Sequence, residues 1–237
     1  GGALGRGQML GAGKTLGAAP YPPAAAPRRD RLCRNDLGAG EGDGARTLRF
    51  TDVTGGSGID IRTYGMGLAV GDIDNDGFDD IYRTGLAEGV LLHNNGDGTF
   101  SDITAESGVA NAGGWGVSAA FLDIDRDGRL DLYVGNYLNY SLDGDIDCLS
   151  VAGRSDYCPP NSYRAQPDRL YRNLGNRRFA DITGRALLGG AYGPALGVST
   201  ADFDGDGWID IYVGNDGQPN QLWINQKDGT FKETAFL

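Results

Sequence analysis

A nine-residue aspartate motif occurs three times in this 237-residue chain and constrains the fold more than any other feature. The motif reads D-x-D-x-D-G-x-x-D and begins at Asp72, Asp123 and Asp202. Each copy follows a run of small, glycine-containing sequence and precedes a short apolar run that contains tyrosine. Because each copy holds the same place in a larger unit, the motif indicates a repeat architecture.

The larger unit closes with a Phe-x-Asp/Glu block that begins at Phe50, Phe100, Phe179 and, in a weaker copy, Phe231. Between the blocks lie short β-branched and aromatic runs bounded by Gly, Asn and Asp, which predict strands and hairpin turns. Four short strands per unit of about 50 residues are typical of a propeller blade. We therefore predict an all-β propeller with about three blades and the start of a fourth over residues 48–237.

Two segments fall outside this repeat plan. Residues 1–47 are rich in Gly, Ala, Pro and Arg and are predicted to form a disordered leader or linker. The interval between the second and third Phe blocks is longer than the others, which predicts an insert at about residues 137–167. Propellers typically close with four to eight blades, so we expect this chain to be a fragment of a larger ring.

The aspartate loops have the chemistry of a calcium site. Calcium takes six to eight oxygen ligands, and aspartates at positions 1, 3 and 5 of a tight loop point toward one centre. Glycine at position 6 permits the turn, a backbone carbonyl at position 7 adds an oxygen, and aspartate at position 9 completes the set. The predicted ligands are Asp72, Asp74, Asp76, Phe78 and Asp80; Asp123, Asp125, Asp127, Arg129 and Asp131; and Asp202, Asp204, Asp206, Trp208 and Asp210.

Other interpretations of the loops fit less well. Magnesium keeps fewer protein ligands, and zinc or copper would require His or Cys, which the motif lacks. An EF-hand needs Glu at position 12 and flanking helices, whereas position 12 is Arg83, Val134 or Val213. Asp-Gly pairs also occur in plain turns, but three matching loops in three repeats argue against that reading. Four clustered carboxylates repel one another, which further favours a bound cation.

Charge and cysteine content narrow the class of protein. The net charge of −11 argues against a nucleic-acid surface, which needs clustered Lys and Arg. No apolar run reaches the roughly 18 residues of a membrane span. Cys148 and Cys158 lie in one loop-like segment; a disulfide between them, which would imply an oxidising compartment, is favoured over two unpaired thiols.

The loops, followed by Ile/Leu-Tyr, resemble FG-GAP/VCBS repeats, the calcium-binding blades of integrin-α-like propellers. The segments 118–123, Leu170-Tyr171-Arg172-Asn173 and 179–183 resemble more specifically the cartilage-acidic-protein-like group. The resemblance implies a seven-bladed propeller with calcium on its blade loops. It also implies a protein that is secreted, extracellular, or at the cell surface or periplasm.

We expect a structural or adhesive module in which three calcium ions rigidify the blade loops, with a protein or glycan as ligand. The alternative is a carbohydrate-active protein, either a polysaccharide lyase or a lectin. His93, the single histidine, is expected to lie on a strand surface rather than in a catalytic site, so no enzymatic activity is expected. A lectin would use the aromatic residues Trp115, Tyr137, Tyr140, Tyr157 and Tyr163, which could instead pack against one another.

Overall fold

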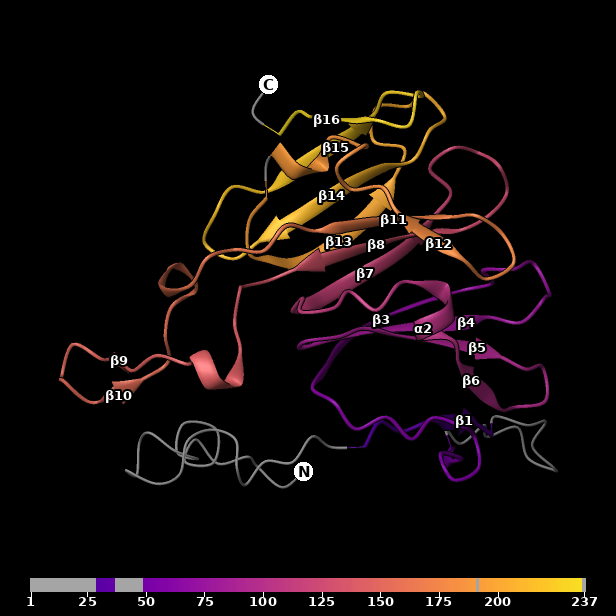
Figure 1. The fold of residues 1–237 in the computed structure, drawn as a ribbon, viewed down its shortest axis with the longest axis horizontal. Helices are drawn as coiled ribbons and strands as arrows, with labels where there is room; N and C mark the ends of the chain where they lie inside the picture. The colour runs from indigo at the N-terminus through magenta and orange to yellow at the C-terminus, as the bar shows by residue number, and fades with distance from the viewer. Residues whose placement is uncertain (1–28, 37–48, 191, 236–237) are drawn as a thin grey trace, which may run out of the picture.

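The protein is described by a computed structural model that covers residues 29–36, 49–190 and 192–235. Three four-stranded antiparallel sheets stack beside one another and make up most of the described chain (Figure 1). The prediction of an all-β propeller fold built from four-stranded blades is therefore confirmed. None of the helices among these residues has the length and apolar character needed to cross a bilayer. The helical turns are α2 (Thr104–Ser107), η2 (Leu142–Gly144), η3 (Pro160–Ser162) and η4 (Leu188–Gly190).

Each blade is a meander in which the strands pair in chain order. The first strands of the three blades, β3, β7 and β13, lie next to one another, as the inner strands of propeller blades do. The first blade comprises β3 (Gly65–Gly71), β4 (Asp80–Gly85), β5 (Val90–Asn94) and β6 (Phe100–Asp102). The second comprises β7 (Gly116–Leu122), β8 (Asp131–Asn136), β11 (Arg169–Asn173) and β12 (Phe179–Asp181). The third comprises β13 (Ala195–Ala201), β14 (Asp210–Asn215), β15 (Gln221–Asn225) and β16 (Phe231–Glu233).

The hydrophobic core lies between the blades and not within any one of them. Tyr82 and Leu91 of the first blade pack with Leu132 of the second in one buried cluster. Leu170 of the second blade packs with Ile211 of the third in another. A fully buried Leu or Ile side chain stabilises the fold by about 1.5–3 kcal/mol, so adjacent blades depend on each other for stability.

The glycine-rich inner strands allow this close stacking. A Cβ atom added to Gly67 of β3 would lie 2.3 Å from the backbone oxygen of Val117 in β7. No real side chain tolerates that distance, so glycine is required where the first two blades meet.

Two strands near the start of the described chain repeat the outer half of a blade. β1 (Cys33–Asn35) pairs antiparallel with β2 (Phe50–Asp52), and Asn35 lies opposite Phe50. In the second blade Asn173 lies opposite Phe179 in the same register. The prediction that residues 1–47 form a disordered leader is corrected for residues 29–36, which are folded. The remainder of that segment lies outside the described residues.

The signal for this half blade is present in the sequence. The run Arg31-Leu32-Cys33-Arg34-Asn35 resembles Arg169-Leu170-Tyr171-Arg172-Asn173 of β11. The backbone N–H of Leu32 donates to the Thr54 hydroxyl at 2.9 Å, and Leu170 makes the same bond to Thr183 at 2.9 Å. The composition of the surrounding segment concealed this similarity.

The predicted insert lies between β8 and β11 and projects from the blades (Figure 1). It carries η2, η3 and the two-stranded sheet of β9 (Cys148–Leu149) and β10 (Ser155–Asp156). The predicted disulfide between Cys148 and Cys158 is present, with a Cα–Cα distance of 5.2 Å. It closes the projecting part of the insert, while Cys33 is a free, exposed cysteine.

A buried carboxylate, Asp168, anchors the insert where it returns to the blade. Its Oδ2 accepts a hydrogen bond from the Tyr133 hydroxyl at 2.7 Å, and its Oδ1 accepts one from the Asn136 N–H at 2.7 Å. Burial raises the pKa of Asp168 to about 7, although both hydrogen bonds act in the opposite direction.

Replacing Asp168 with Asn is expected to flatten the pH dependence of stability between about pH 4 and pH 7. The native pKa lies above the unfolded value, so the proton stabilises the native state fully below the unfolded pKa. That contribution is lost as the pH rises through the native pKa. Urea unfolding of both proteins across this range measures the difference. Burial also raises the pKa of Asp131 to about 7. Asp131 therefore contributes the same pH dependence of stability to both proteins. Identical slopes would contradict the shifted pKa of Asp168.

Candidate metal centres

The three aspartate loops join the first and second strands of their blades and share one pattern of backbone hydrogen bonds. The aspartate at position 1 accepts from the N–H groups of positions 5 and 6, which winds the loop tightly. In the first loop Asp72 accepts from Asp76 at 3.1 Å and from Gly77 at 2.8 Å. The equivalent bonds join Asp123 to Asp127 and Gly128, and Asp202 to Asp206 and Gly207.

The aspartates at position 9 are held by the backbone of their own blade. Asp80, Asp131 and Asp210 are buried, and each accepts one backbone hydrogen bond on each carboxylate oxygen. Of these three position-9 aspartates, Asp80 belongs to a group of acidic ligand atoms that lie within 4.8 Å of one another in the described part of the chain. The position-9 aspartates therefore clamp the loop backbone, and this clamping explains their burial.

Positions 4 and 6 take left-handed backbone conformations in every loop. Position 4 has φ values of 59° at Asn75, 60° at Arg126 and 80° at Gly205. Position 6 is glycine throughout, with φ of 81° at Gly128. Such conformations cost non-glycine residues about 1–2 kcal/mol, which explains the glycine of the motif.

The Gly128→Ala variant is expected to be less stable by about 1–2 kcal/mol. Nothing lies within 4 Å of a Cβ atom added at Gly128, so the backbone conformation accounts for the cost. Gly184 offers the same open space without a left-handed φ, and Gly184→Ala is the matched control. Urea unfolding measures both, and equal effects of the two substitutions would contradict this explanation.

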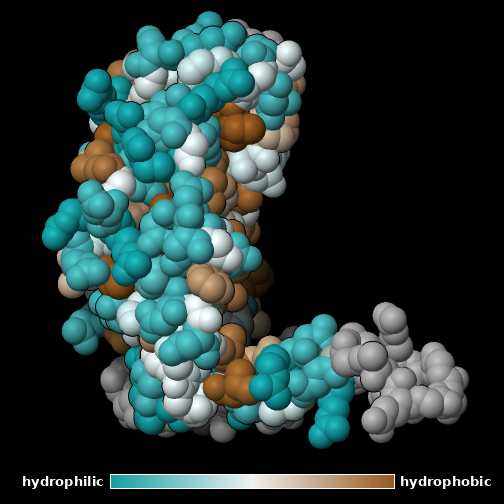
Figure 2. Space-filling model, turned by 90° about the vertical axis from the view of Figure 1, so that its right-hand side faces the viewer, coloured by the Kyte–Doolittle hydropathy of each residue, from teal (hydrophilic) through white to brown (hydrophobic). Residues whose placement is uncertain are grey.

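The loops of adjacent blades touch one another. The side chain of Asn75 in the first loop donates to the backbone oxygen of Gly128 in the second at 3.0 Å. The guanidinium of Arg126 in the second loop lies 5.6 Å from the ring centroid of Trp208 in the third. The loops thus form one continuous rim along the stacked blades. The surface seen from the right-hand side of Figure 1 is mostly hydrophilic (Figure 2).

Basic side chains pair with the loop carboxylates, which sequence reasoning did not anticipate. Arg177 Nε lies 2.7 Å from Asp74 Oδ2, and Arg172 Nη2 lies 2.5 Å from Asp125 Oδ2. In the third loop Lys227 Nζ lies 3.0 Å from Asp206 Oδ2. Part of the negative charge is therefore balanced by the protein itself. Repulsion among the aspartates is consequently weaker evidence for a metal than the motif alone suggested.

Other features of the loops fit a cation. Groups of aspartate oxygens lie within 4.8 Å of one another in each loop: Asp72, Asp74 and Asp80; Asp123, Asp125 and Asp127; and Asp202, Asp204 and Asp206. Among the described residues, the buried Oδ1 atoms of Asp74 and Asp125 have no hydrogen-bond partner. A buried carboxylate oxygen without a partner is costly, and a bound cation would satisfy it.

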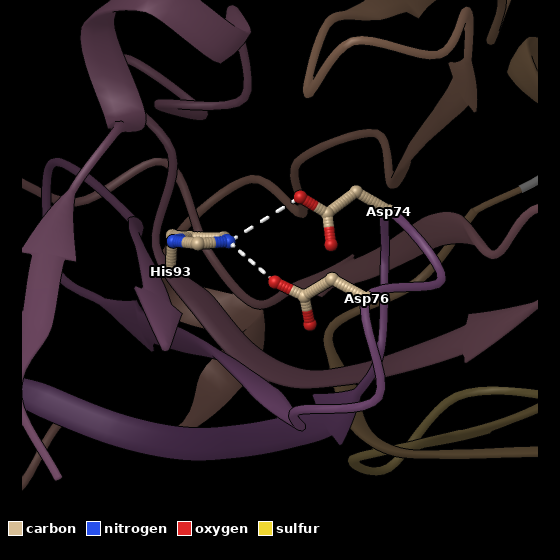
Figure 3. Close-up of side chains that lie close together, drawn as sticks. All are labelled: Asp74, Asp76 and His93. Atoms are coloured by element: carbon tan, nitrogen blue, oxygen red, sulfur yellow. Dashed lines mark ion pairs between the residues drawn. The ribbon is translucent and has the colours of Figure 1, made fainter. Parts of the chain in front are cut away.

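The first loop contains a residue that the motif does not include. His93 of β5 is buried, and its Nε2 atom lies 3.3 Å from Oδ2 of Asp74 and 3.3 Å from Oδ2 of Asp76 (Figure 3). The expected position on the strand surface is therefore corrected: the imidazole points into the loop. In the strand register His93 lies opposite Ser101, and Arg172 lies opposite Ala180 in the second blade. Comparing residues at this position between repeats would have linked both to the loops.

The aromatic residues considered for sugar stacking mostly contact one another. Trp115 packs on Tyr137 and on Tyr140, with ring centroids 5.1 Å apart in both pairs. Tyr140 in turn packs on Tyr163 at 5.5 Å. Only Tyr157 of this set is strongly exposed. The cluster therefore fastens the insert to the second blade.

Repeated four-stranded blades with an acidic loop after the first strand define a propeller-type repeat protein. The chain belongs to the FG-GAP-like repeat family, which matches residues 85–134, 140–213 and 202–236. The match includes the second and third aspartate loops completely.

Curated relatives extend this assignment. Cartilage acidic protein 1 of Homo sapiens is 30% identical over 172 residues, which cover 71% of this chain and 22% of that protein. The Mus musculus protein is 28% identical over 172 residues, with coverage of 71% and 22%. The Xenopus tropicalis protein is 28% identical over 199 residues, with coverage of 69% and 31%. The chain thus spans less than a third of the length of these relatives. This supports the predicted resemblance to the cartilage-acidic-protein-like group.

Among solved structures, a lectin of Agrocybe aegerita, described as recognising non-reducing terminal N-acetylglucosamine, aligns with a TM-score of 0.44 and 20% sequence identity. The alignment covers 79% of this chain and 43% of the lectin. A likeness of this size carries no inference about a ligand.

Proposed function

We propose that this chain is a calcium-binding repeat module of an extracellular protein, in which the cations rigidify the blade loops. The observation that carries the proposal is the presence of three loops with the same hydrogen-bond pattern and converging aspartates. Two of them hold buried carboxylate oxygens without a partner among the described residues. Carboxylate oxygens are the ligands that calcium prefers.

The ligand set in each loop supports calcium over other cations. Aspartates at positions 1, 3 and 5 supply carboxylates, and the backbone oxygens of Phe78, Arg129 and Trp208 can extend the set. Such a shell of protein oxygens suits calcium, whereas magnesium retains several waters. A calcium ion in each loop would hold the strand ends of its blade in place.

Two observations support an extracellular location. The Cys148–Cys158 disulfide requires an oxidising compartment to persist. The recognised relatives are cartilage acidic proteins. Within such a protein we propose a structural or adhesive role, with a protein or glycan partner.

We also propose that the chain is not an enzyme. Its single histidine faces the aspartates of the first loop, which ties that side chain to the candidate metal centre. The stacked aromatic residues of the insert have a packing role, which weakens the case for a carbohydrate-active protein.

Calorimetric titration of the metal-free chain with calcium tests the proposal. We expect a stoichiometry of three and a much weaker response to magnesium. The Asp125→Asn variant is expected to lower the calcium stoichiometry or weaken one site, because it replaces a ligand of the second loop. The Asp228→Asn variant is the control, since Asp228 caps an exposed hairpin turn outside the loops. Absence of calcium binding by the folded chain would reject the proposed function.

A further inference from the structure

We propose that the first aspartate loop is a mixed nitrogen and oxygen site that binds a transition-metal ion, with zinc as the reference cation. The inference rests on the proposed function, because it takes these loops to be divalent-cation sites. It adds that His93 gives one loop a chemical selectivity that the other two lack.

His93 meets the requirements of a metal ligand. The side chain is 5% exposed, and Nε2 has no hydrogen-bond partner among the described residues. Nε2 lies 3.3 Å from Oδ2 of Asp74, 3.3 Å from Oδ2 of Asp76 and 4.0 Å from Oδ1 of Asp80. Figure 3 shows the imidazole edge directed at the two nearer carboxylates. A neutral imidazole would place a lone pair against negative oxygens, so a cation between them relieves the conflict.

The spacing is compatible with metal coordination. Two ligand atoms that are each about 2.1 Å from a tetrahedral zinc ion lie about 3.4 Å apart. The measured separations of 3.3 Å agree with that value. Calcium would tolerate similar spacings, so the distances do not distinguish zinc from calcium. The nitrogen ligand does. Imidazole suits zinc and other late first-row ions, whereas calcium takes oxygen ligands.

The second ring nitrogen supports the same assignment. Nδ1 lies 3.4 Å from the side-chain oxygen of Asn95, in the turn after β5. With the proton on Nδ1 facing this oxygen, the Nε2 lone pair is directed into the loop. Histidine ligands of metals commonly have their other nitrogen oriented in this way.

The neighbouring charges shape this site. Arg177 of the second blade pairs with Asp74 Oδ2 at 2.7 Å, while Asp74 Oδ1 remains buried without a partner. Oδ1 is therefore the oxygen of Asp74 that a zinc ion can take without displacing Arg177. Asp72 and Asp80 lie in the adjoining acidic group.

The other two loops differ at the position of His93. The equivalent residue is Arg172 in the second blade and Ile224 in the third, where it lies opposite Lys232. Neither can coordinate a metal through nitrogen at neutral pH, because arginine stays protonated and isoleucine has no ligand atom. The selectivity is thus confined to the first loop.

Zinc titration of the full metal-free chain tests the proposal. We expect one zinc ion to bind tightly, and the His93→Gln variant to bind it at least about tenfold more weakly. Calcium stoichiometry is measured on the same samples: we expect three calcium ions in the absence of zinc, and two, in the second and third loops, once zinc occupies the first. Loss of calcium binding there would count against the proposed function, whereas unchanged zinc affinity in His93→Gln would overturn only the present inference.

A nitrogen-15 spectrum of the labelled chain gives an independent readout, because the sequence contains one histidine. Stoichiometric zinc is expected to shift the Nε2 resonance, and calcium is expected to leave it near its metal-free position. If His93 serves only as an imidazolium paired with the aspartates, zinc leaves Nε2 protonated and the inference is overturned. In that case His93→Gln would bind zinc more tightly at the first loop, because the substitution removes a positive charge. Arg172→Gln would have the same effect at the second loop.

A gain of function keeps the test decisive if His93→Gln fails to fold. Ile224→His places an imidazole at the same register position beside the third loop. The variant is expected to bind a second zinc ion. An unchanged zinc stoichiometry in a folded Ile224→His protein would show that an imidazole at this register position does not coordinate a metal ion in the loop, and would overturn the inference.

Discussion

Saturating calcium is expected to raise the free energy of unfolding of this chain by about 8 kcal/mol and the melting temperature by on the order of 20 °C. A ligand at a hundred times its dissociation constant stabilises the native state by about 2.7 kcal/mol per site. The geometry of each site depends on the folded backbone, in which Asp72, Asp123 and Asp202 each accept hydrogen bonds from two N–H groups. The unfolded chain has no comparable site.

Thermal melts across a calcium titration, with magnesium in parallel, measure this effect. The Asp125→Asn variant is expected to lose about a third of the stabilisation, or roughly 2.7 kcal/mol. Asp228→Asn is expected to retain all of it. An equal response to magnesium would contradict the choice of calcium as the cation. A full calcium response in Asp125→Asn would contradict the assignment of the second loop.

The Asn173→Ala variant is expected to be less stable by about 3–4 kcal/mol, because the amide side chain joins two blades. Its Nδ2 donates to the backbone oxygen of Ile73 in the first loop at 2.8 Å and to that of Leu130 in the second at 3.0 Å. Its Oδ1 accepts from Gly175 at 2.9 Å. Truncation leaves three buried or half-buried backbone groups without this partner.

The repeat supplies its own controls. Asn225 of the third blade donates to Ile124 of the second loop at 2.9 Å, so Asn225→Ala is expected to cost a similar amount. Among the described partners, the side chain of Asn94 in the first blade bonds only Asp79 and Gly96 of its own blade. Asn94→Ala is therefore expected to cost about 1 kcal/mol. Urea unfolding measures all three, and an equal cost for Asn94 and Asn173 would show that the bond between blades contributes little.

The repeat and the loops could be predicted from the sequence because both are local. Hydrophobic spacing, Asp-Gly turns and the Phe blocks each lie within a few residues, so they were visible without a structure. The disulfide followed from two cysteines in one segment. The fold class, the insert and the winding of the loops all depend on such short-range patterns.

The contacts that were not foreseen join residues far apart in the chain. Asn173 and Ile73 are 100 residues apart, and Arg177 and Asp74 are 103 apart. His93 belongs to an apolar strand, where nothing local indicates that its ring turns toward Asp74 and Asp76. The pair of β1 and β2 was concealed by the glycine, alanine and proline around it. Only aligning the repeats strand by strand would have exposed these residues.

The asparagine bond between blades always runs from one blade to the loop of the preceding blade, and this polarity bears on how such chains evolve. The joint occurs twice: Asn173 at the end of the third strand of the second blade donates to the carbonyl of Ile73 in the first loop, and Asn225 of the third blade donates to that of Ile124 in the second loop. A duplicated unit carries both halves of the joint, so it can be added beside its parent without a change in the neighbour. Loss of one loop residue, in contrast, disturbs two blades at once. Gene duplication by whole blades is thus a low-risk route to longer proteins, and small deletions within the loops are the changes that selection should remove.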